Sequence, residues 1–320
     1  MDVTSTTTNK AQFYGEGGKY FAILIVNLIL TMLTLGLYYP WARAKNLQYL
    51  YGETEFEGSR LTFHGTGQEM FRGLVKALIV LAILYAVYFG SLMSKSGGVI
   101  ALGLLIFLVG LCLVIPLAIH GGLRYRMSRT SWRGIHFGYR GNLKELFAIC
   151  AKGIFFTVIT LGIYSSWFQV NLRKYITDNV RLGNLKFSFE GDGTDLFIIH
   201  LKFGFLVYIT LGIYTFWYLR NVNHFHINNL KLEQDGKQLS FNSTLTPGEI
   251  FTTDLGNILL LIFTLGLATP WVIIRRMRMV LNNVEVEPGF NAEAVLQTEE
   301  SYSDATGDDL LSMLDIGLDF

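Results

Sequence analysis

A short string that occurs four times in the chain constrains its fold more than any other feature. It reads TLGLYYPW at 34–41, and it returns as TLGIYSSW at 160–167, TLGIYTFW at 210–217 and TLGLATPW at 264–271. Each copy closes a long apolar run, and Arg or Lys follows within a few residues. Similarity that recurs along a chain is typical of tandem structural units. We therefore take the repeat as the basis of the architecture.

A phenylalanine near the start of each run sets the register of the repeat. The distance to the motif tryptophan is 20 residues in every copy: Phe21 to Trp41, Phe147 to Trp167, Phe197 to Trp217 and Phe251 to Trp271. Twenty helical residues extend about 30 Å, which is the thickness of the hydrocarbon core of a bilayer. The spacing predicts a membrane-spanning helix with an interfacial aromatic residue near each membrane surface.

The composition is that of an integral membrane protein. The 320 residues are 51% hydrophobic and 16% charged, whereas a soluble domain carries about 25% charged residues. We predict an all-α integral membrane protein, with short β-hairpins in the connecting loops. It would have about six transmembrane helices in five tandem repeats of roughly 50 residues.

The recurring phenylalanine also predicts the boundaries of the units. Phe71 marks a second unit that lacks the motif and is about 26 residues longer, so we expect it to contain an extra span. The predicted units lie near 13–60, 61–132, 133–183, 184–236 and 237–282, between a polar tail, 1–12, and an acidic disordered tail, 283–320. The first residues lack a secretory signal pattern, so we expect the first apolar run to remain as an anchor.

The segments between and within these units carry strand and helix signals. Alternating residues around glycine-containing turns predict β-hairpins at 54–65, 180–193 and 230–242. The apolar runs 73–93 and 98–119 are separated only by a short turn, which predicts a helical hairpin in the membrane.

The distribution of basic residues orients this six-span arrangement poorly. The loops on one side would hold 13 Lys and Arg residues and those on the other side 10, which is a weak bias. Single-span units also alternate in direction, so the same motif would lie on opposite faces. The alternative is that Thr-Leu-Gly breaks the helix within the membrane and the chain turns back, which requires cover for the freed backbone groups. Both arrangements stay open at this point.

Charge is unevenly distributed along the chain. All 26 Lys and Arg residues lie at or before Arg278, and the last 38 residues hold ten acids, so the body carries +11 and the tail −10. The lipid bilayer is the expected partner. Anionic phospholipids would contact Arg124, Arg126, Arg129 and Arg133, although these can equally be the ordinary flanking charges of membrane helices. The acidic and apolar stretch 308–320 would dock on a protein partner or stay disordered.

Several stretches together resemble a known family. They are an FxGxG pattern, the TLG motif with its basic exit, FHGTGQE at 63–69 and RYRMSRTSWRGIHFGYRG at 124–141. Up to about Asn283 the chain is similar to the bacterial YjgN-like inner-membrane proteins, a family without a known function. The resemblance implies a multi-pass protein of the bacterial inner (cytoplasmic) membrane, and it implies no catalytic residues. The second and third TLG copies depart from the pattern by lacking Pro, and the fourth lacks Tyr.

Four carboxylates share one place, two residues before the phenylalanine that opens a run: Glu69, Glu145, Asp195 and Glu249. The main interpretation is that each complements the positive end of its own helix, which contributes about 0.3–1 kcal/mol. The functional alternative is that they converge with His200 into a polar site for a cation or a proton.

No other pattern predicts chemistry. His224 and His226 alternate as in a strand or loop, but the chain has no HExxH and no third ligand at metal-site spacing. Cys112 and Cys150 fit small core residues. We therefore expect no metal, no cofactor, no catalytic residue and no nucleic-acid partner.

Three classes of function remain. A transport-like or permeating protein is favoured, and it predicts that Asn27, Thr157, Thr160, Thr210 and Thr264 face a common interior. A non-catalytic scaffold or an anionic-lipid-binding protein predicts apolar interfaces with cationic loops on lipid head groups. An intramembrane enzyme comes third, because it would need histidines and carboxylates gathered in one cavity.

Overall fold

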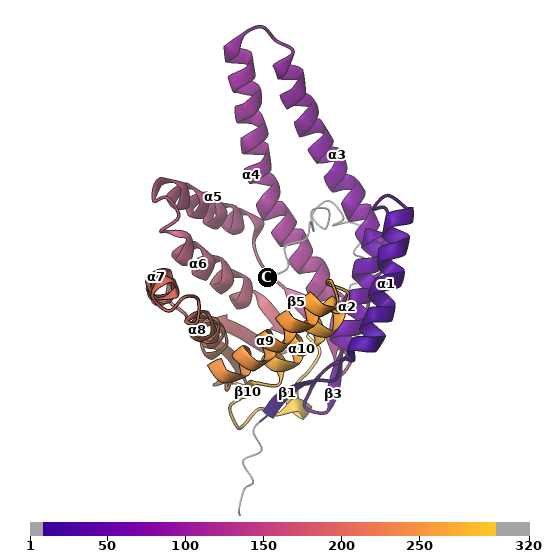
Figure 1. The fold of residues 1–320 in the computed structure, drawn as a ribbon, viewed down its shortest axis with the longest axis vertical. Helices are drawn as coiled ribbons and strands as arrows, with labels where there is room; N and C mark the ends of the chain where they lie inside the picture. Colours follow the sequence, from indigo (N-terminus) through magenta and orange to yellow (C-terminus); the bar gives the residue numbers. More distant parts are fainter. Residues whose placement is uncertain (1–8, 299–320) are drawn as a thin grey trace, which may run out of the picture.

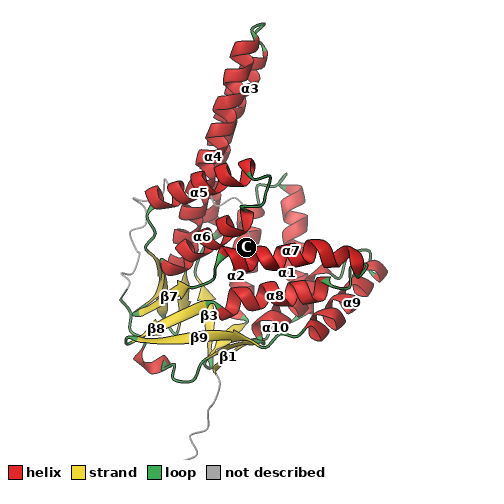
Figure 2. Cartoon of the chain, turned by 90° about the vertical axis from the view of Figure 1, so that its left-hand side faces the viewer, coloured by secondary structure: helices red, strands yellow, loops and turns green. Residues whose placement is uncertain are grey.

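The structure of the chain is a computed structural model that describes residues 9–298. Within that range the backbone forms a closed β-barrel and a group of helices that extend away from it (Figure 1). One pair of helices projects far beyond the others (Figure 2). The acidic stretch 308–320, for which we predicted either docking on a protein partner or disorder, lies outside the described residues.

Ten short antiparallel strands make up the barrel in the described range. They are β1 (Asn9–Phe13), β2 (Thr54–Phe56), β3 (Ser59–Phe63), β4 (Thr130–Trp132), β5 (Ile135–Tyr139), β6 (Val180–Leu182), β7 (Leu185–Phe189), β8 (Leu230–Gln234), β9 (Lys237–Ser243) and β10 (Val284–Val286). Each strand pairs with its neighbours in chain order, and β1 pairs with β10 to close the barrel.

Apolar side chains fill the barrel and polar side chains cover it. A single buried cluster collects residues from β4 and from β6 to β10. The next residues along these strands point outward, and among them Lys186 and Glu233 form an exposed ion pair of 3.1 Å. The segment that follows β10 adds Phe290, whose ring lies 5.3 Å from that of Phe56 and 6.1 Å from that of Trp132. The barrel therefore has a packed core.

The described helices are joined in five pairs. The pairs are α1 (Gly17–Leu33) with α2 (Tyr39–Gly52), α3 (Gly67–Leu92) with α4 (Gly97–Ser128), α5 (Leu143–Ile159) with α6 (Ser165–Asp178), α7 (Gly193–Ile209) with α8 (Thr215–Asn228), and α9 (Pro247–Phe263) with α10 (Thr269–Leu281). A short 3₁₀ helix, η1 (Ala292–Ala294), follows the barrel.

The topology places every helix pair at the same end of the barrel. Each pair follows an odd-numbered strand and leads into the next even-numbered strand. Because adjacent strands are antiparallel, those strand ends all lie at one rim, which we call the helix rim. The tight turns of β2–β3, β4–β5, β6–β7 and β8–β9 lie at the opposite rim, which we call the turn rim.

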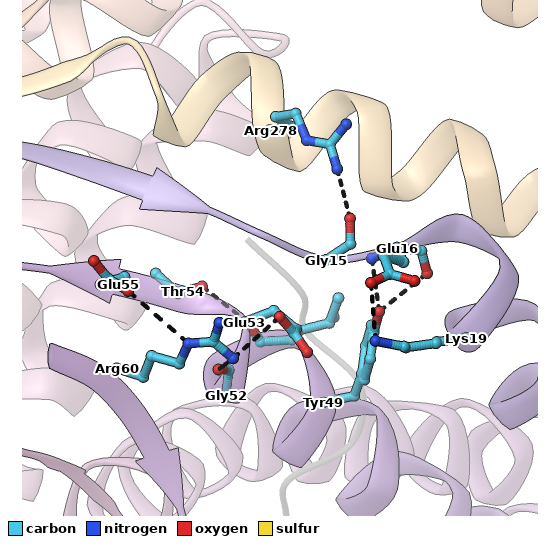
Figure 3. A network of polar contacts seen from close by, with 11 residues as sticks. Gly15, Glu16, Lys19, Tyr49, Gly52, Glu53, Thr54, Glu55, Arg60 and Arg278 are labelled. Carbon is cyan, nitrogen blue, oxygen red and sulfur yellow. Dashed lines mark hydrogen bonds and ion pairs between the residues drawn. The ribbon is translucent and has the colours of Figure 1, made fainter. Parts of the chain in front are cut away.

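The helices also form a closed ring. Each helix contacts the next one in the chain, and α10 contacts α1. At this closing junction Arg278 of α10 donates to the carbonyl of Gly15 at 2.7 Å, and Tyr49 of α2 donates to the carbonyl of Glu16 at 3.0 Å (Figure 3). The start of α1 is therefore held from both sides.

Tryptophans of the repeated motif lock neighbouring pairs together. The rings of Trp41, Trp167 and Trp271 lie 5.1–5.2 Å from the phenylalanine that is the fifth residue of the next helix. Each also covers the glycine at the start of that helix, so that a Cβ on Gly17 would overlap the ring of Trp271. At the junction of α8 with α9, Pro247 stands in place of this glycine. There the ring of Phe216, the residue before the motif tryptophan, lies 5.0 Å from the ring of Phe251.

The prediction of an all-α fold with about six transmembrane helices is wrong. The described residues contain a ten-strand barrel, and only α3 and α4 are long and apolar enough to cross a membrane. In each of the four apolar runs that carry the TLG motif, the first helix ends at the motif, where the chain reverses and a second helix begins. The alternative in which Thr-Leu-Gly breaks the helix describes the observed backbone. Hydropathy could not detect the break, because the turn is as apolar as the helix.

The structure contains the predicted hairpins together with strands that were not predicted. The β-hairpins predicted at 54–65, 180–193 and 230–242 are present, as is the helical hairpin formed by α3 and α4. The strands β1, β4, β5 and β10 were not predicted, since each has five residues or fewer and lies close to strong helix signals. The expectation that the second segment gains a helix is also wrong, because it has two helices, like the others, and both are longer.

Candidate membrane interface

The turn at the first motif ends one helix and starts the next with a fixed set of hydrogen bonds. Thr34 caps α1, Leu35 adopts a left-handed conformation with φ of 49°, and Gly36 follows with φ of 92°. The N–H of Gly36 donates to the carbonyl of Thr31 at 2.8 Å, and that of Leu35 donates to Met32 at 3.1 Å. This is a Schellman motif, with leucine where glycine is common.

The threonine hydroxyl joins the two helices of the turn. It donates to the carbonyl of Leu30 at 2.7 Å and accepts the N–H of Tyr38, which caps α2, at 3.0 Å. As a result, every backbone N–H from Thr34 to Tyr39 has a partner within the turn. A backbone whose donors are satisfied internally can lie in hydrocarbon, where an unsatisfied group costs several kcal/mol.

The other three turns repeat this geometry. Their threonine hydroxyls accept the N–H four residues ahead at 2.9–3.1 Å, and their leucines have φ of 49–50°. The leucines are also among the most exposed residues of the chain: Leu35 is 95% exposed, Leu161 94%, Leu211 92% and Leu265 93%. The tips of four helix pairs therefore each carry an exposed leucine, and further exposed apolar side chains flank it.

The pair α3–α4 has a different tip and a different length. Its turn contains Ser94, Lys95 and Ser96 and lacks the motif. The uncharged part of α3 from Ala77 to Leu92 extends about 24 Å, and that of α4 from Gly97 to Leu123 about 40 Å. With a hydrocarbon core of about 30 Å, this pair can carry its polar turn across a bilayer.

Charged residues limit how deeply the four shorter pairs can insert. The first Lys or Arg of the returning helix lies about 6 to 12 Å along the helix axis from the first helical residue; these cations are Arg43, Arg173, Arg220 and Arg275. On the outgoing helices Lys152, Lys202 and Asp254 lie about 10 to 14 Å before the helix end. The uncharged tips therefore match one leaflet, about 15 Å, and not the whole core.

The four carboxylates that we expected either to cap helices or to converge lie in four different pairs. Glu69 and Glu249 complete capping boxes with Thr66 and Thr246 at the starts of α3 and α9. Glu69 also pairs with Arg129 at 2.6 Å. Glu145 and Asp195 lie in the first turns of α5 and α7. Within residues 9–298 no three His, Cys, Asp or Glu side chains are close enough to hold a metal ion.

The two histidines that alternate in the sequence belong to a helix and not to a strand or loop. His224 and His226 both lie on α8, so the expectation from their alternation is wrong. His224 contacts the carbonyl of Leu245 at 2.8 Å, and His200 contacts the hydroxyl of Ser166 at 3.0 Å.

A buried basic cluster was not predicted from the sequence. The guanidinium of Arg173 lies 5.4 Å over the ring of Phe189, and its Nε has no hydrogen-bond partner. The Nδ1 of His226 is buried and also lacks a partner. Burial, and then the nearby charges of Arg173 and His200, lower the pKa of His226 to about 4. The sequence around these residues, NLRKYI at 171–176 and NHFHIN at 223–228, mixes polar and apolar residues and carries no signal for the cluster.

The basic residues considered for lipid contact divide into two groups. Arg124 and Arg126 lie in the last turns of α4, near the helix rim. Arg129 is engaged by Glu69, and Arg133 lies in the β4–β5 turn at the turn rim, with its guanidinium 5.5 Å over Trp132.

The polar residues expected to face a common interior do not meet in the described structure. Asn27 donates to the carbonyl of Ala42 and to Asn46, both on the partner helix of its own pair, at 3.3 Å. The hydroxyls of Thr160, Thr210 and Thr264 cap three separate turns. The hydroxyl of Thr157 is buried without a partner, in the same pair as Thr160.

Comparison with known proteins places the chain in a family. The chain matches the family described as a bacterial protein of unknown function (DUF898) over residues 8–208 and 219–313. It also matches several proteins named Inner membrane protein YjgN. That of Escherichia coli strain K12 is 36% identical over 144 residues, which is 45% of this chain and 33% of the relative.

Two further relatives carry the same name. The protein of Escherichia coli O157:H7 is 34% identical over 163 residues, 51% of this chain and 37% of the relative. The protein of Salmonella typhimurium strain LT2 is 34% identical over 134 residues, 42% of this chain and 32% of the relative. The matched stretch therefore spans only about a third of each relative's length. No solved structure matches the chain.

Proposed function

Because the chain belongs to the bacterial DUF898 family of unknown function, whose named relatives are inner membrane proteins, we propose that it is a non-catalytic lipid-organising scaffold of that membrane. In this proposal α3 and α4 cross the bilayer, and the four shorter helix pairs insert their tips into one leaflet. The barrel stays in water on that same side. The observation that carries the proposal is the set of four leucine tips, each more than 90% exposed.

Charge supports a cytoplasmic position for the barrel. Most of the chain's 26 Lys and Arg residues lie on the helices near the helix rim or on the barrel, whereas Lys95 is the charged residue at the far tip of α3–α4. Positive residues remain on the cytoplasmic side of inner-membrane proteins. The weak bias of the six-span arrangement becomes a strong one when the TLG turns do not cross.

The units are proposed to be tandem copies of one element, near the boundaries 13–60, 61–132, 133–183, 184–236 and 237–282. Each would contribute a strand, a helix pair and a second strand. The recurrence of the motif and of its hydrogen bonds supports this division.

The packed barrel core and the separate threonine caps favour the scaffold over the transport-like alternative. Four apolar tips in one leaflet add area to that leaflet alone. Bilayers respond to such one-sided insertion by curving, and amphipathic insertions are correspondingly sensitive to curvature.

Reconstitution into vesicles of inner-membrane lipids tests this function. The mean vesicle diameter should fall as the protein-to-lipid ratio rises. A variant with all four tip leucines changed to serine (Leu35→Ser, Leu161→Ser, Leu211→Ser and Leu265→Ser) should lose this effect, while α3–α4 keeps it in the bilayer. A vesicle diameter that is independent of the protein ratio would overturn the proposal.

A further inference from the structure

A polar cleft lies between α9 and α10, close to the helix rim. Its volume is about 460 Å³, and its walls include Thr252, Thr253, Arg275, Arg278 and Asn282. Both arginines come from α10, and the two threonines come from α9. The hydroxyl of Thr252 donates to the carbonyl of Gly248 at 3.0 Å, so the arginines and Asn282 are the main donors of the cleft. Guanidinium, hydroxyl and amide groups are the donors that proteins use to hold phosphate.

The cations of this cleft differ in what already binds them. Arg275 is exposed and forms no hydrogen bond or ion pair with any described residue. Arg278 uses one nitrogen on the carbonyl of Gly15, which fixes the guanidinium in place and leaves its other donors for a ligand. The adjacent Arg276 is not available, because it pairs with Asp254 through two hydrogen bonds of 3.0 and 3.1 Å.

The one carboxylate in the cleft is also committed. Glu249 accepts the N–H and the hydroxyl of Thr246 through the same oxygen, both at 2.9 Å, in the capping box of α9. Its charge is therefore held toward the start of the helix. The remaining groups form a site with a surplus of positive donors.

The cleft lies at the height of a lipid head group if the tip of this pair is inserted. Arg275 and Arg278 lie about 9 and 14 Å along α10 from its first residue. One leaflet of hydrocarbon is about 15 Å thick. An inserted tip at Leu265, with α10 along the membrane normal, would bring both guanidinium groups to the level of the phosphates.

A second cleft in the chain provides an internal comparison. It lies at the same place between α5 and α6, with a volume of about 310 Å³. Counting back from the following strand, Asn171 replaces Arg275, Lys174 replaces Arg278 and Asp178 replaces Asn282. This cleft has no guanidinium and one more carboxylate, so it is poorly matched to phosphate.

We propose that the α9–α10 cleft binds the phosphate diester of an anionic phospholipid. The inference rests on the proposed insertion of the hairpin tips, since that insertion brings the head groups to the cleft. Phosphatidylglycerol is the appropriate probe, because it has a phosphate diester and a net negative charge. Phosphatidylethanolamine has the same diester but carries an ammonium group that two arginines would repel.

Native mass spectrometry of the full chain in detergent tests the proposal. Added phosphatidylglycerol should bind the wild type more tightly than phosphatidylethanolamine does. Arg275→Gln should weaken phosphatidylglycerol binding about fivefold, as expected for one well-placed cation. Lys174→Gln removes one charge from the comparison cleft and should leave the affinity unchanged. Equal effects of both variants, or no effect of Arg275→Gln, would overturn the assignment.

Inorganic phosphate separates a lipid site from a site for free phosphate. It should displace phosphatidylglycerol only weakly, since the acyl chains add affinity along the apolar helices. Complete displacement by inorganic phosphate would overturn the lipid assignment. Failure of this site is distinguishable from failure of the proposed function, because the vesicle diameter depends on the four tips, none of which Arg275→Gln alters.

Discussion

The leucine of each TLG turn has a left-handed backbone conformation that is unfavourable for residues other than glycine. A left-handed backbone costs an ordinary residue about 1–2 kcal/mol, and glycine adopts it without that cost. Four leucines accept it, at φ of 49–50°, while they expose nearly their whole side chains. Burying a leucine in an apolar phase contributes about 1.5–3 kcal/mol. In the proposed membrane position, burial of these side chains in hydrocarbon would offset the strain.

Removing one threonine hydroxyl should destabilise a single turn. In Thr160→Val the N–H of Tyr164 loses its acceptor, and the carbonyl of Phe156 loses one of its donors. The expected loss is about 1–2 kcal/mol of unfolding free energy, measured in detergent with a denaturant. Thr160→Ser keeps the hydroxyl and is the matched control. Equal stability of Thr160→Val and Thr160→Ser would show that the cap is dispensable.

His226 should make the fold sensitive to acid. The unfolded chain takes up this proton near the ordinary pKa of 6.5, whereas the folded chain does so only near 4. Stability therefore falls as the pH is lowered from about 6.5 to about 4, by about 3 kcal/mol at most. His226→Leu uses the residue found at the same place in α2, Leu50, and removes this proton uptake. The free energy of unfolding, measured by denaturant titration at several pH values in this range, should then depend much less on pH. If the free energy of unfolding depended on pH as strongly in His226→Leu as in the wild type, the proposed role of His226 would be contradicted.

At the scale of elements, the ring of helices is held together by the contact of a motif tryptophan with the start of the next helix. Gly17→Ala places a methyl group against Trp271, with only 2.6 Å to its Cγ, and should cost about 1–3 kcal/mol. Gly18→Ala is the matched control, because nothing lies within 4 Å of its Cβ, and helix propensity favours alanine by up to about 1 kcal/mol. Thermal unfolding of the two variants should move in opposite directions. Similar melting temperatures would mean that this junction does not support the ring.

The elements differ in how far the sequence could predict them. The hairpins around Gly58, Asn184 and Gly236 carry local turn signals, and they are present. The six-span prediction misses the four helix pairs of the TLG motif, because a reversal and the end of a span have the same apolar signal. The alternative in which Thr-Leu-Gly breaks the helix contains them. A Schellman turn made of Leu and Gly is apolar, so periodicity and hydropathy continue through it. The short strands β4 and β10 have no local signal, and they form because the barrel offers them partners.

The same distinction applies to the candidate sites. The capping role of Glu69 and Glu249 follows from local spacing, and the structure has that geometry. The pairing of Arg129 with Glu69 and the clustering of Arg173 with His226 depend on which helices become neighbours. The packing of α3 on α4 sets the first contact, and the positions of α6 and α8 around the barrel set the second. No pattern within a single segment contains that information.

The molecule as a whole is organised by its antiparallel barrel. A closed antiparallel barrel returns every connection of one kind to one rim, which resolves the difficulty that alternating spans would put the same motif on opposite faces. All four leucine tips and the long pair α3–α4 originate from that rim. We therefore expect three depths: the turn rim and the barrel in water, the leucine tips in lipid, and the α3–α4 turn beyond the bilayer.

Accessibility of single cysteines tests that central claim most directly. Cys112→Ala removes the exposed thiol, and Cys150 is buried and can remain. In this background Lys186→Cys gives a barrel variant, Leu161→Cys a tip variant and Ser94→Cys a long-turn variant.

A membrane-impermeant maleimide should label the barrel variant only in inverted vesicles and the long-turn variant only in intact spheroplasts. It should leave the tip variant unlabelled in both preparations. Labelling of the tip variant in intact spheroplasts would mean that the short pairs cross the bilayer. Labelling of the tip variant in inverted vesicles would mean that the tips never enter it.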